Sequence, residues 1–556
     1  MNMKEGLIPK RKLVVGMFAL YAVCLSAAGL PFGSDLIVQS HQVAAFSRTD
    51  HQPANIYRVP LLNNPITLDP ASAQDLYGIL VIRQLFDGLV RFSRDLFVIP
   101  ALAENWRVED QGKTYRFFLR SDATFHNGKP VTSGDVVFSL SRLLRVKPHS
   151  TIVPHLLRIR GARDYMEGRS ESVEGLKAID EKILLIHLES PYVPLLVSLA
   201  MHSASIVPQE QLGEGKMVLT PGLVGSGPFR FVHWDQNEKI RLERFPAYYR
   251  EPARVDGLEF MIYPGIDVQR VWEDFRQGRI EEMPAYPQFR RELEQLEGLQ
   301  WVRRPALSVQ FYGFNLNHPL FRDSELRALL AQAIERPRLG STVYAGLGEA
   351  AAGVLPPGLP GYQPDARDPS PAIGSKWENV REKINASLGP GARIEIVSNS
   401  QSPVAQAELR FVQEAWKRLG VEMEPRFIPD WNEFKEYLRS DKMQMYRHMW
   451  SADIPDPDDF LRILFASDSP MNYMHYQNPQ VDRMLDEAVG ILEPVTRARR
   501  YREIELLIME SNPLIPLIHP SVVMVYQPYV RDIEMTALGS SSVSYHRVWL
   551  DRRAAP

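Results

Sequence analysis

Several residue types and motifs are scarce in this 556-residue chain, and each scarcity excludes a class of protein. The only cysteine is Cys24, so neither an internal disulfide nor a cysteine metal cluster can form. The net charge is only −3, which provides no basic surface for nucleic acid. The nucleophile elbow and the zinc-binding HExxH motif are both missing, which argues against two kinds of exported hydrolase. We therefore expect no nucleic-acid partner, no metal, no cofactor and no catalysis.

The N-terminus carries an export pattern. Lys10, Arg11 and Lys12 precede an apolar run over residues 13–30, and Ser26 and Ala28 are small enough for a cleavage site. A run of that length also suits a retained membrane anchor, which needs about 20 apolar residues. Residues 1–30 are therefore predicted to be a signal peptide or an anchor, residues 31–54 a linker, and the remainder periplasmic or otherwise extracytoplasmic.

The following residues alternate between strand-like and helix-like patterns. Residues 55–62 read as a strand, and Leu80, Ile82, Leu85, Phe86 and Leu89 recur near helical spacing. An alternating strand around Tyr115, Phe117 and Leu119 leads to a turn at Asn127-Gly128, where we expect His126 to be solvated. Thr132 and Asp135 then form a capping-box pattern that begins a helix. Further along, residues 225–249 predict a hairpin, and residues 393–428 a second α/β unit.

The stretch "MWSADIPDPDDFLRILFAS", residues 449–467, combines a strand end with four aspartates. Residues 443–451 predict a strand whose alternation places Arg447, Met449 and Ser451 on one side. Pro455 and Pro457 end that strand, and Asp456, Asp458 and Asp459 suit the N-terminus of the next helix. Asp453 is the carboxylate without an evident structural purpose.

Seven segments, in this order, resemble family 5 of the extracellular solute-binding proteins, the peptide-, oligopeptide- and nickel-binding receptors of ABC importers. These segments are "LDP" (68–70), "IRQLFDGLVRF" (82–92), residues 100–144, "PYVPLL" (191–196), "GSGPFRF" (225–231), residues 314–334 and "WSADIPDPDDFL" (450–461). The resemblance implies an α/β, two-lobed, periplasmic-binding-protein type II-like fold with an extra subdomain inserted in the first lobe. On that basis lobe I is predicted over 55–92, 215–310 and 520–553, the extra subdomain over 93–214, and lobe II over 311–519.

The same resemblance, closest to the oligopeptide-binding members near the site, implies roles for individual residues. Asp453 matches an aspartate that holds the ligand's amino group, and Arg447 an arginine near the ligand's carboxylate. The strand between them spans about 20 Å, which suits a peptide of roughly two to five residues. Trp431 and Trp450 match aromatic walls of the ligand pocket. Leu76, Met449 and Ser451 match positions that contact the ligand through their backbone. Ala405 departs from the pattern, because some members have a histidine there.

The sequence therefore predicts a monomeric extracytoplasmic receptor that closes on a short peptide and delivers it to an ABC permease. Other ligands of the same fold remain open: a nickel chelate, an opine or an oligosaccharide. His448 and His475 flank the predicted site and could serve nickel, although they are not a close pair. An exported hydrolase with a carboxylate pair is a weaker alternative, because Asp456, Asp458 and Asp459 lie beside prolines and a helix start.

Overall fold

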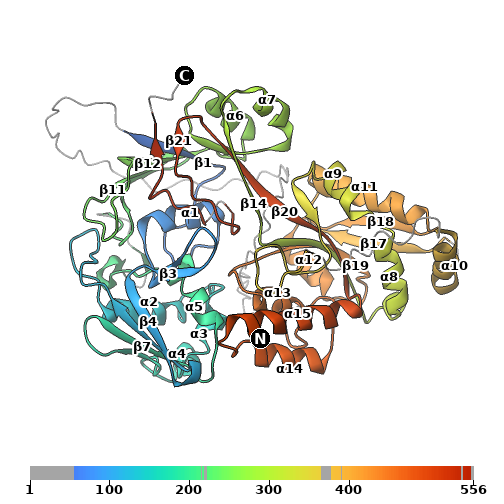
Figure 1. The fold of residues 1–556 in the computed structure, drawn as a ribbon, viewed down its shortest axis with the longest axis horizontal. Helices are drawn as coiled ribbons and strands as arrows, with labels where there is room; N and C mark the ends of the chain where they lie inside the picture. The colour runs from blue at the N-terminus through green and yellow to red at the C-terminus, as the bar shows by residue number, and fades with distance from the viewer. Residues whose placement is uncertain are drawn as a thin grey trace, which may run out of the picture.

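A computed structural model describes residues 55–213, 216–217, 222–364, 377–389, 391–539 and 542–551. The predicted leader, residues 1–30, and the linker, residues 31–54, lie outside these ranges. None of the described helices is long and apolar enough to span a membrane. Figure 1 shows the N-terminal half of the chain on one side, together with β21 (Val530–Arg531), and most of the second half on the other. The strands β14 (Gln300–Pro305) and β20 (Leu514–Tyr526) run between the two sides.

The first sheet has the strand order β1-β12-β11-β10, with β1 and β12 parallel and the other pairs antiparallel. Its strands are β1 (Ile56–Leu61), β10 (Phe229–Asp235), β11 (Lys239–Arg244) and β12 (Gly257–Ile262). Helix α1 (Leu76–Leu85) packs its apolar face on this sheet. It begins after Asp75, whose carboxylate accepts the Gly78 N–H at 2.8 Å, and it ends at Leu85 because Phe86 is extended. The predicted helix is thus confirmed, but it stops before Leu89.

A second antiparallel sheet, with the order β4-β5-β7-β6, lies within residues 93–214, the predicted extra subdomain, which we call the insertion. Tyr115, Phe117 and Leu119 of β5 are buried as the alternation predicted, and Thr132 and Asp135 form the predicted capping box of α2. The elements here are β4 (Ala103–Glu109), β5 (Thr114–Leu119), β6 (Leu176–Ala178), β7 (Ile183–His187), α2 (Ser133–Leu143), α3 (Val153–Leu156), α4 (Ala162–Met166) and α5 (Pro194–Ser198).

The expectation that His126 is solvated is wrong. Its Nδ1 accepts the Gly225 N–H at 3.1 Å, and its Nε2 lies 3.0 Å from the Gly227 carbonyl oxygen. Burial lowers the pKa of His126 to about 4, so the ring is neutral. The histidine therefore holds the glycine loop of residues 225–227 against the insertion.

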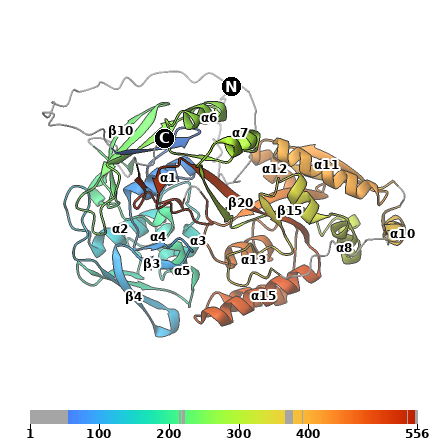
Figure 2. The same ribbon diagram turned by 45° about the horizontal axis from the view of Figure 1, so that its top comes forward.

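The largest sheet carries the path β13-β20-β15-β19-β17-β18, and β14 and β16 also pair with β20. Its strands are β13 (Glu282–Pro284), β14 (Gln300–Pro305), β15 (Ser308–Phe314), β16 (Gly348–Ala350), β17 (Arg393–Ser398), β18 (Glu422–Phe427), β19 (Met445–Ser451) and β20 (Leu514–Tyr526). The long strand β20 pairs with β15 at one end and with β13 and β14 at the other. It is one continuous link between the two halves (Figure 2).

Helices cover both faces of the large sheet. Tyr312, Phe314 and Met445 pack on one face against α8 (Ser324–Gln332), α9 (Arg336–Thr342), α10 (Trp377–Leu388) and α11 (Pro403–Lys417). Tyr446 and Trp450 pack on the other face against α12 (Trp431–Leu438), α13 (Asp458–Phe465), α14 (Pro479–Ala488) and α15 (Pro494–Glu510). The remaining elements are α6 (Val268–Arg276), α7 (Arg290–Gln295), β2 (Val90–Phe92), β3 (Val98–Pro100), β8 (Leu212–Gly213), β9 (Lys216–Met217), β21 (Val530–Arg531) and β22 (Trp549–Leu550).

The division into lobes stays a prediction, but two of its boundaries fall inside strands. The 310/311 boundary cuts β15 and the 519/520 boundary cuts β20, so the large sheet is shared across the proposed division. The insertion also touches the second half. Ile454 is fully buried in the insertion's apolar core, and the Val193 N–H donates to the Val489 carbonyl oxygen at 2.8 Å.

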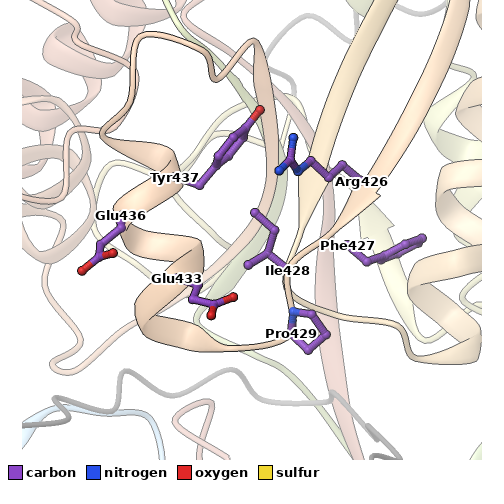
Figure 3. A pocket seen from close by; sticks show the side chains of 7 residues that line it. All are labelled: Arg426, Phe427, Ile428, Pro429, Glu433, Glu436 and Tyr437. Atoms are coloured by element: carbon purple, nitrogen blue, oxygen red, sulfur yellow. The ribbon is translucent and has the colours of Figure 1, made fainter.

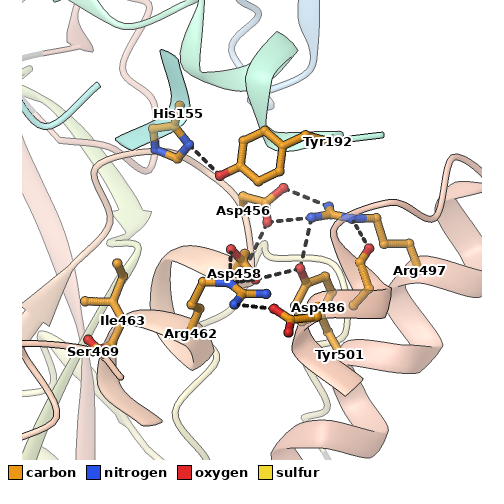
Figure 4. Close-up of polar contacts among 11 residues, drawn as sticks. His155, Tyr192, Asp456, Asp458, Arg462, Ile463, Ser469, Asp486, Arg497 and Tyr501 are labelled. Atoms are coloured by element: carbon orange, nitrogen blue, oxygen red, sulfur yellow. Dashed lines mark hydrogen bonds and ion pairs between the residues drawn. The ribbon is translucent and has the colours of Figure 1, made fainter. Parts of the chain in front are cut away.

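Two of the aspartates after β19, Asp456 and Asp458, are held inside the second half (Figure 4). Both oxygens of Asp456 accept from Arg497 of α15, at 2.7 and 2.9 Å, and Oδ1 also accepts the Asp458 N–H at 2.9 Å. Asp458 accepts from Tyr501 and pairs with Arg462. Near this cluster, Nδ1 of His155 lies 2.8 Å from the Tyr192 hydroxyl. The predicted helix capping is met only in part, because the N-cap residue of α13 is Pro457, without a side-chain cap, and Asp456 accepts the Asp458 N–H. Asp456 and Asp458 also join α13 to α15.

Replacing Arg497 with alanine should lower the free energy of unfolding by about 3–5 kcal/mol, because it leaves the buried Asp456 carboxylate without its cation. Chemical denaturation of the purified protein measures this. The matched control is Arg500→Ala in the same helix, whose pair with Glu487 is solvated and worth about 0–1 kcal/mol. Equal losses in the two variants would contradict the structural role of the Asp456 pair.

Candidate functional site

One edge of β19 is open at its C-terminal end. On the first edge, β15 pairs along the whole strand, and the Ala452 N–H donates to the Leu307 carbonyl oxygen at 2.9 Å. On the second edge, β17 pairs only as far as Tyr446, and no other described strand continues the ladder. Because successive peptide groups point to opposite edges, the N–H and C=O groups of Met449 and Ser451 point to the open edge. These groups are therefore available to pair with an added strand, and the ligand contact of the two residues stays a prediction.

Asp453 stands at the end of this edge, two residues beyond β19. Its side chain is exposed to solvent, yet it forms no ion pair with any described residue. The protein atoms around it remove part of its hydration and raise its pKa to about 6. Its backbone N–H donates to Asp459 at 2.9 Å, and burial followed by the Asp453 charge raises the pKa of Asp459 well above its usual range. The carboxylate of Asp453 is thus accessible to solvent and yet partly desolvated by the protein atoms around it.

Arg447, by contrast, is already paired. Its Nε and Nη2 donate to the two carboxylate oxygens of Glu408 at 2.9 and 3.1 Å. Glu408 lies in α11, has a side chain with 0% exposure, and also accepts from the Tyr344 hydroxyl. Although burial alone lowers the pKa of Arg447, the Glu408 charge outweighs it, and the pKa lies above its ordinary value. The guanidinium is thus held under α11 rather than standing free at the strand edge.

The two predicted tryptophans differ in burial. Trp450 is 4% exposed and belongs to the apolar core of the second half, whereas Trp431 is half-buried at the start of α12. Trp431 stacks on the His448 ring of β19 with the ring centres 6.0 Å apart. The indole nitrogens of both tryptophans and Nε2 of His448 are buried without a hydrogen-bond partner among the described residues. Three such nitrogens around one strand form a group of polar atoms that a ligand could satisfy.

Leu76 lies apart from the other predicted residues. It is the first residue of α1, where a helix leaves backbone N–H groups without intrahelical partners, and it is half-buried. No contact described in the structure joins it to β19. Ala405 is fully buried in the first turn of α11, one turn before Glu408 and on the same helical face. The structure therefore gathers the predicted residues of the second half and leaves Leu76 in the first.

A cavity of about 410 Å³ opens between the end of β18 and α12 (Figure 3). Its walls are Arg426, Phe427, Ile428, Pro429, Glu433, Glu436 and Tyr437, none of them a predicted site residue. The Arg426 guanidinium lies over the Tyr437 ring at 4.5 Å, and both side chains contact Glu395. Two polar walls of this cavity, Arg426 and Tyr437, are thus already paired with Glu395.

The histidines considered for nickel are not part of a metal-ligand cluster. Within the described residues, no group of three or more His, Cys, Asp or Glu side chains is placed to hold a metal ion. Burial lowers the pKa of His448 to about 4, and its ring packs among Phe311, Trp431 and Tyr446. His448 is therefore a neutral aromatic wall in this arrangement.

Two residues that shape the site escaped the sequence reasoning. Glu408 sits in the apolar stripe of α11 between Ala405 and Val412, and a charge in such a stripe is a signal that it has a buried partner. Arg497 in α15 offered the same signal on a helix whose buried face also includes Tyr501 and Ile504. In both cases the spacing marks a buried charge, but the identity of its partner depends on tertiary packing.

Comparison with known proteins places this geometry in a family. Residues 98–472 match the model of bacterial extracellular solute-binding proteins, family 5. A protein of Escherichia coli named as a probable deoxycholate-binding periplasmic protein is 27% identical over 87% of this chain and 91% of its own length. The dipeptide-binding protein of the same organism is 25% identical over 81% of this chain and 86% of its own length.

The fold is also that of solved structures. The unliganded open form of the periplasmic murein tripeptide-binding protein MppA superposes with a TM-score of 0.77, covering 90% of this chain and 98% of that one at 22% identity. This likeness supports the predicted fold class, and the family match extends over most of the chain. The protein belongs to family 5 of the bacterial extracellular solute-binding proteins.

Proposed function

We propose that this protein is an exported receptor that binds short peptides, of about two to five residues, and delivers them to an ABC permease. The observation that carries the proposal is the open edge of β19, which ends at the accessible and unpaired Asp453. A peptide in extended conformation can add to such an edge through backbone hydrogen bonds that do not depend on its side chains. Its α-ammonium would then meet the carboxylate of Asp453.

The charge balance supports an ammonium as the ligand group. A carboxylate that has lost much of its hydration is stabilised by a cation at hydrogen-bond distance. Asp453 is partly desolvated, and the structure describes no protein cation that pairs with it. The half-buried Trp431, with its unpaired indole nitrogen, would form a rigid wall beside the bound peptide. In this proposal Leu76 offers backbone groups from the first half when the two halves close, and the receptor acts as a monomer without catalysis.

Named relatives support peptides without deciding between ligand classes. One relative is named for dipeptides and another for oligopeptides, whereas others are named for deoxycholate and for heme. Native mass spectrometry of the purified exported domain tests the class directly, because a co-purified ligand is identified by its mass. Peptides of two to five residues support the proposal, and a bile acid, a heme, a nickel chelate or a sugar in their place would refute it.

Replacing Asp453 with asparagine should weaken peptide binding about 100-fold or more, since removing one partner of a desolvated charge pair costs about 2–5 kcal/mol. Isothermal titration calorimetry with a peptide found by mass spectrometry measures the loss. Asp441→Asn is the matched control, because Asp441 is exposed at the turn before β19 and should bind as the wild type does. Unchanged affinity in the Asp453 variant would show that the amino group is held elsewhere.

Peptide affinity should fall at acidic pH. Only the ionised form of Asp453 pairs with an ammonium, and its pKa in the free protein is about 6. Binding below that pH must expel a proton, so the dissociation constant should rise about tenfold between pH 7.5 and pH 5, while a peptide ammonium of pKa near 8 stays charged. Titrations at the two pH values check this. The Asp453→Asn variant should lose the dependence, and retention of the full tenfold change would assign it to another group.

A further inference from the structure

The buried pair of Arg447 and Glu408 bears on which end of a ligand the site recognises. Arg447 is the cation that the sequence assigned to a ligand carboxylate, and its side chain is 11% exposed. Glu408 approaches the guanidinium with both oxygens, at 2.9 and 3.1 Å, in the two-pronged geometry that a ligand carboxylate would otherwise adopt. An internal carboxylate therefore occupies that face of the guanidinium.

The surroundings make this pair hard to open. Glu408 has no exposed side-chain surface, and the Tyr344 hydroxyl donates to it as well. Separating the pair to admit a ligand would leave a buried carboxylate without its cation, which costs about 3–5 kcal/mol. A ligand carboxylate that took the place of Glu408 on Nε and Nη2 of Arg447 would not compensate for that loss, because Glu408 would stay buried without its cation.

The net charge of the site follows from this pairing. Arg447 and Glu408 cancel, so among the charged side chains of β19 and of the turn that follows it, Asp453 is the exposed one that no described cation pairs. A site with that balance attracts a single positive charge and offers no surplus cation to a carboxylate. Glu408 is thus the residue that determines whether the carboxyl end of a bound peptide finds an uncompensated charge on Arg447.

We infer that this receptor selects its ligands by their ammonium end and does not require a free α-carboxylate, because Glu408 neutralises Arg447. The preferred ligands are then peptides that carry a positive net charge, including peptides with an amidated or otherwise blocked carboxyl end. This inference rests on the proposed peptide-binding function and specifies its substrate class.

The test compares matched tripeptides that differ only in a free or an amidated C-terminus. Competition between the two forms, followed by native mass spectrometry and titration calorimetry at pH 7.5, yields the acid-to-amide ratio of affinities. For the wild type we expect a ratio within about threefold of one or in favour of the amide, since the arginine of β19, Arg447, is already paired with Glu408. A wild-type preference for the acid of tenfold or more would overturn the inference while leaving the proposed function intact.

A variant sharpens the test. Glu408→Gln keeps the size of the side chain and leaves the charge of Arg447 uncompensated, so binding should shift about tenfold toward the acid form. Glu414→Gln, at an exposed position of the same helix, should keep the wild-type ratio. A folded Glu408→Gln protein with an unshifted ratio would contradict the role of Glu408, and the wild-type ratio decides the matter if that variant does not fold. Failure of both peptide forms to bind would instead refute the proposed function and this inference with it.

Discussion

A carboxylate that is surrounded by protein needs a cation or several donors to remain ionised, and this constraint organises the second half of the molecule. Asp456 has Arg497, and Glu408 has Arg447, in pairs of good geometry. Asp453 is the exception near the strand end, because protein atoms crowd it while no described cation pairs with it. In the proposed function the two kinds of carboxylate have different roles: the paired ones hold helices and strands together, and the exposed, unpaired Asp453 would bind the ligand's ammonium group.

The position of Asp453 connects binding to the arrangement of the two halves. The next residue, Ile454, is buried in the apolar core of the insertion, and Val489 lies in the same cluster. The segment that presents the carboxylate therefore also packs against the other part of the molecule. A ligand held at Asp453 would contact a segment whose packing depends on how the halves meet, which is the physical basis for coupling ligand binding to closure in a two-lobed receptor.

The proposed binding edge is made of backbone groups, which would explain how one fold serves many ligands. The N–H and C=O groups of Met449 and Ser451 are available whatever side chain a ligand carries, so selectivity has to come from the charges around the edge. In this chain those charges are Asp453 and the neutralised pair of Arg447 and Glu408. Relatives of the same fold carry names for bile acid, heme and peptide ligands, which accords with function residing in such site residues rather than in the architecture.

The sequence by itself determined the local structure around the site and the family. The alternation over residues 443–451, the prolines at 455 and 457 and the capping box at Thr132 each predict an element that the structure contains, because these signals act through neighbouring backbone groups. Only the tertiary structure decided the partners of the buried charges. Arg447 meets Glu408 across 39 residues and Asp456 meets Arg497 across 41, and no pattern of spacing specifies which buried anion a cation will meet once helices pack on a sheet. Whether an ionisable side chain serves the fold or remains free for a ligand depends on that packing.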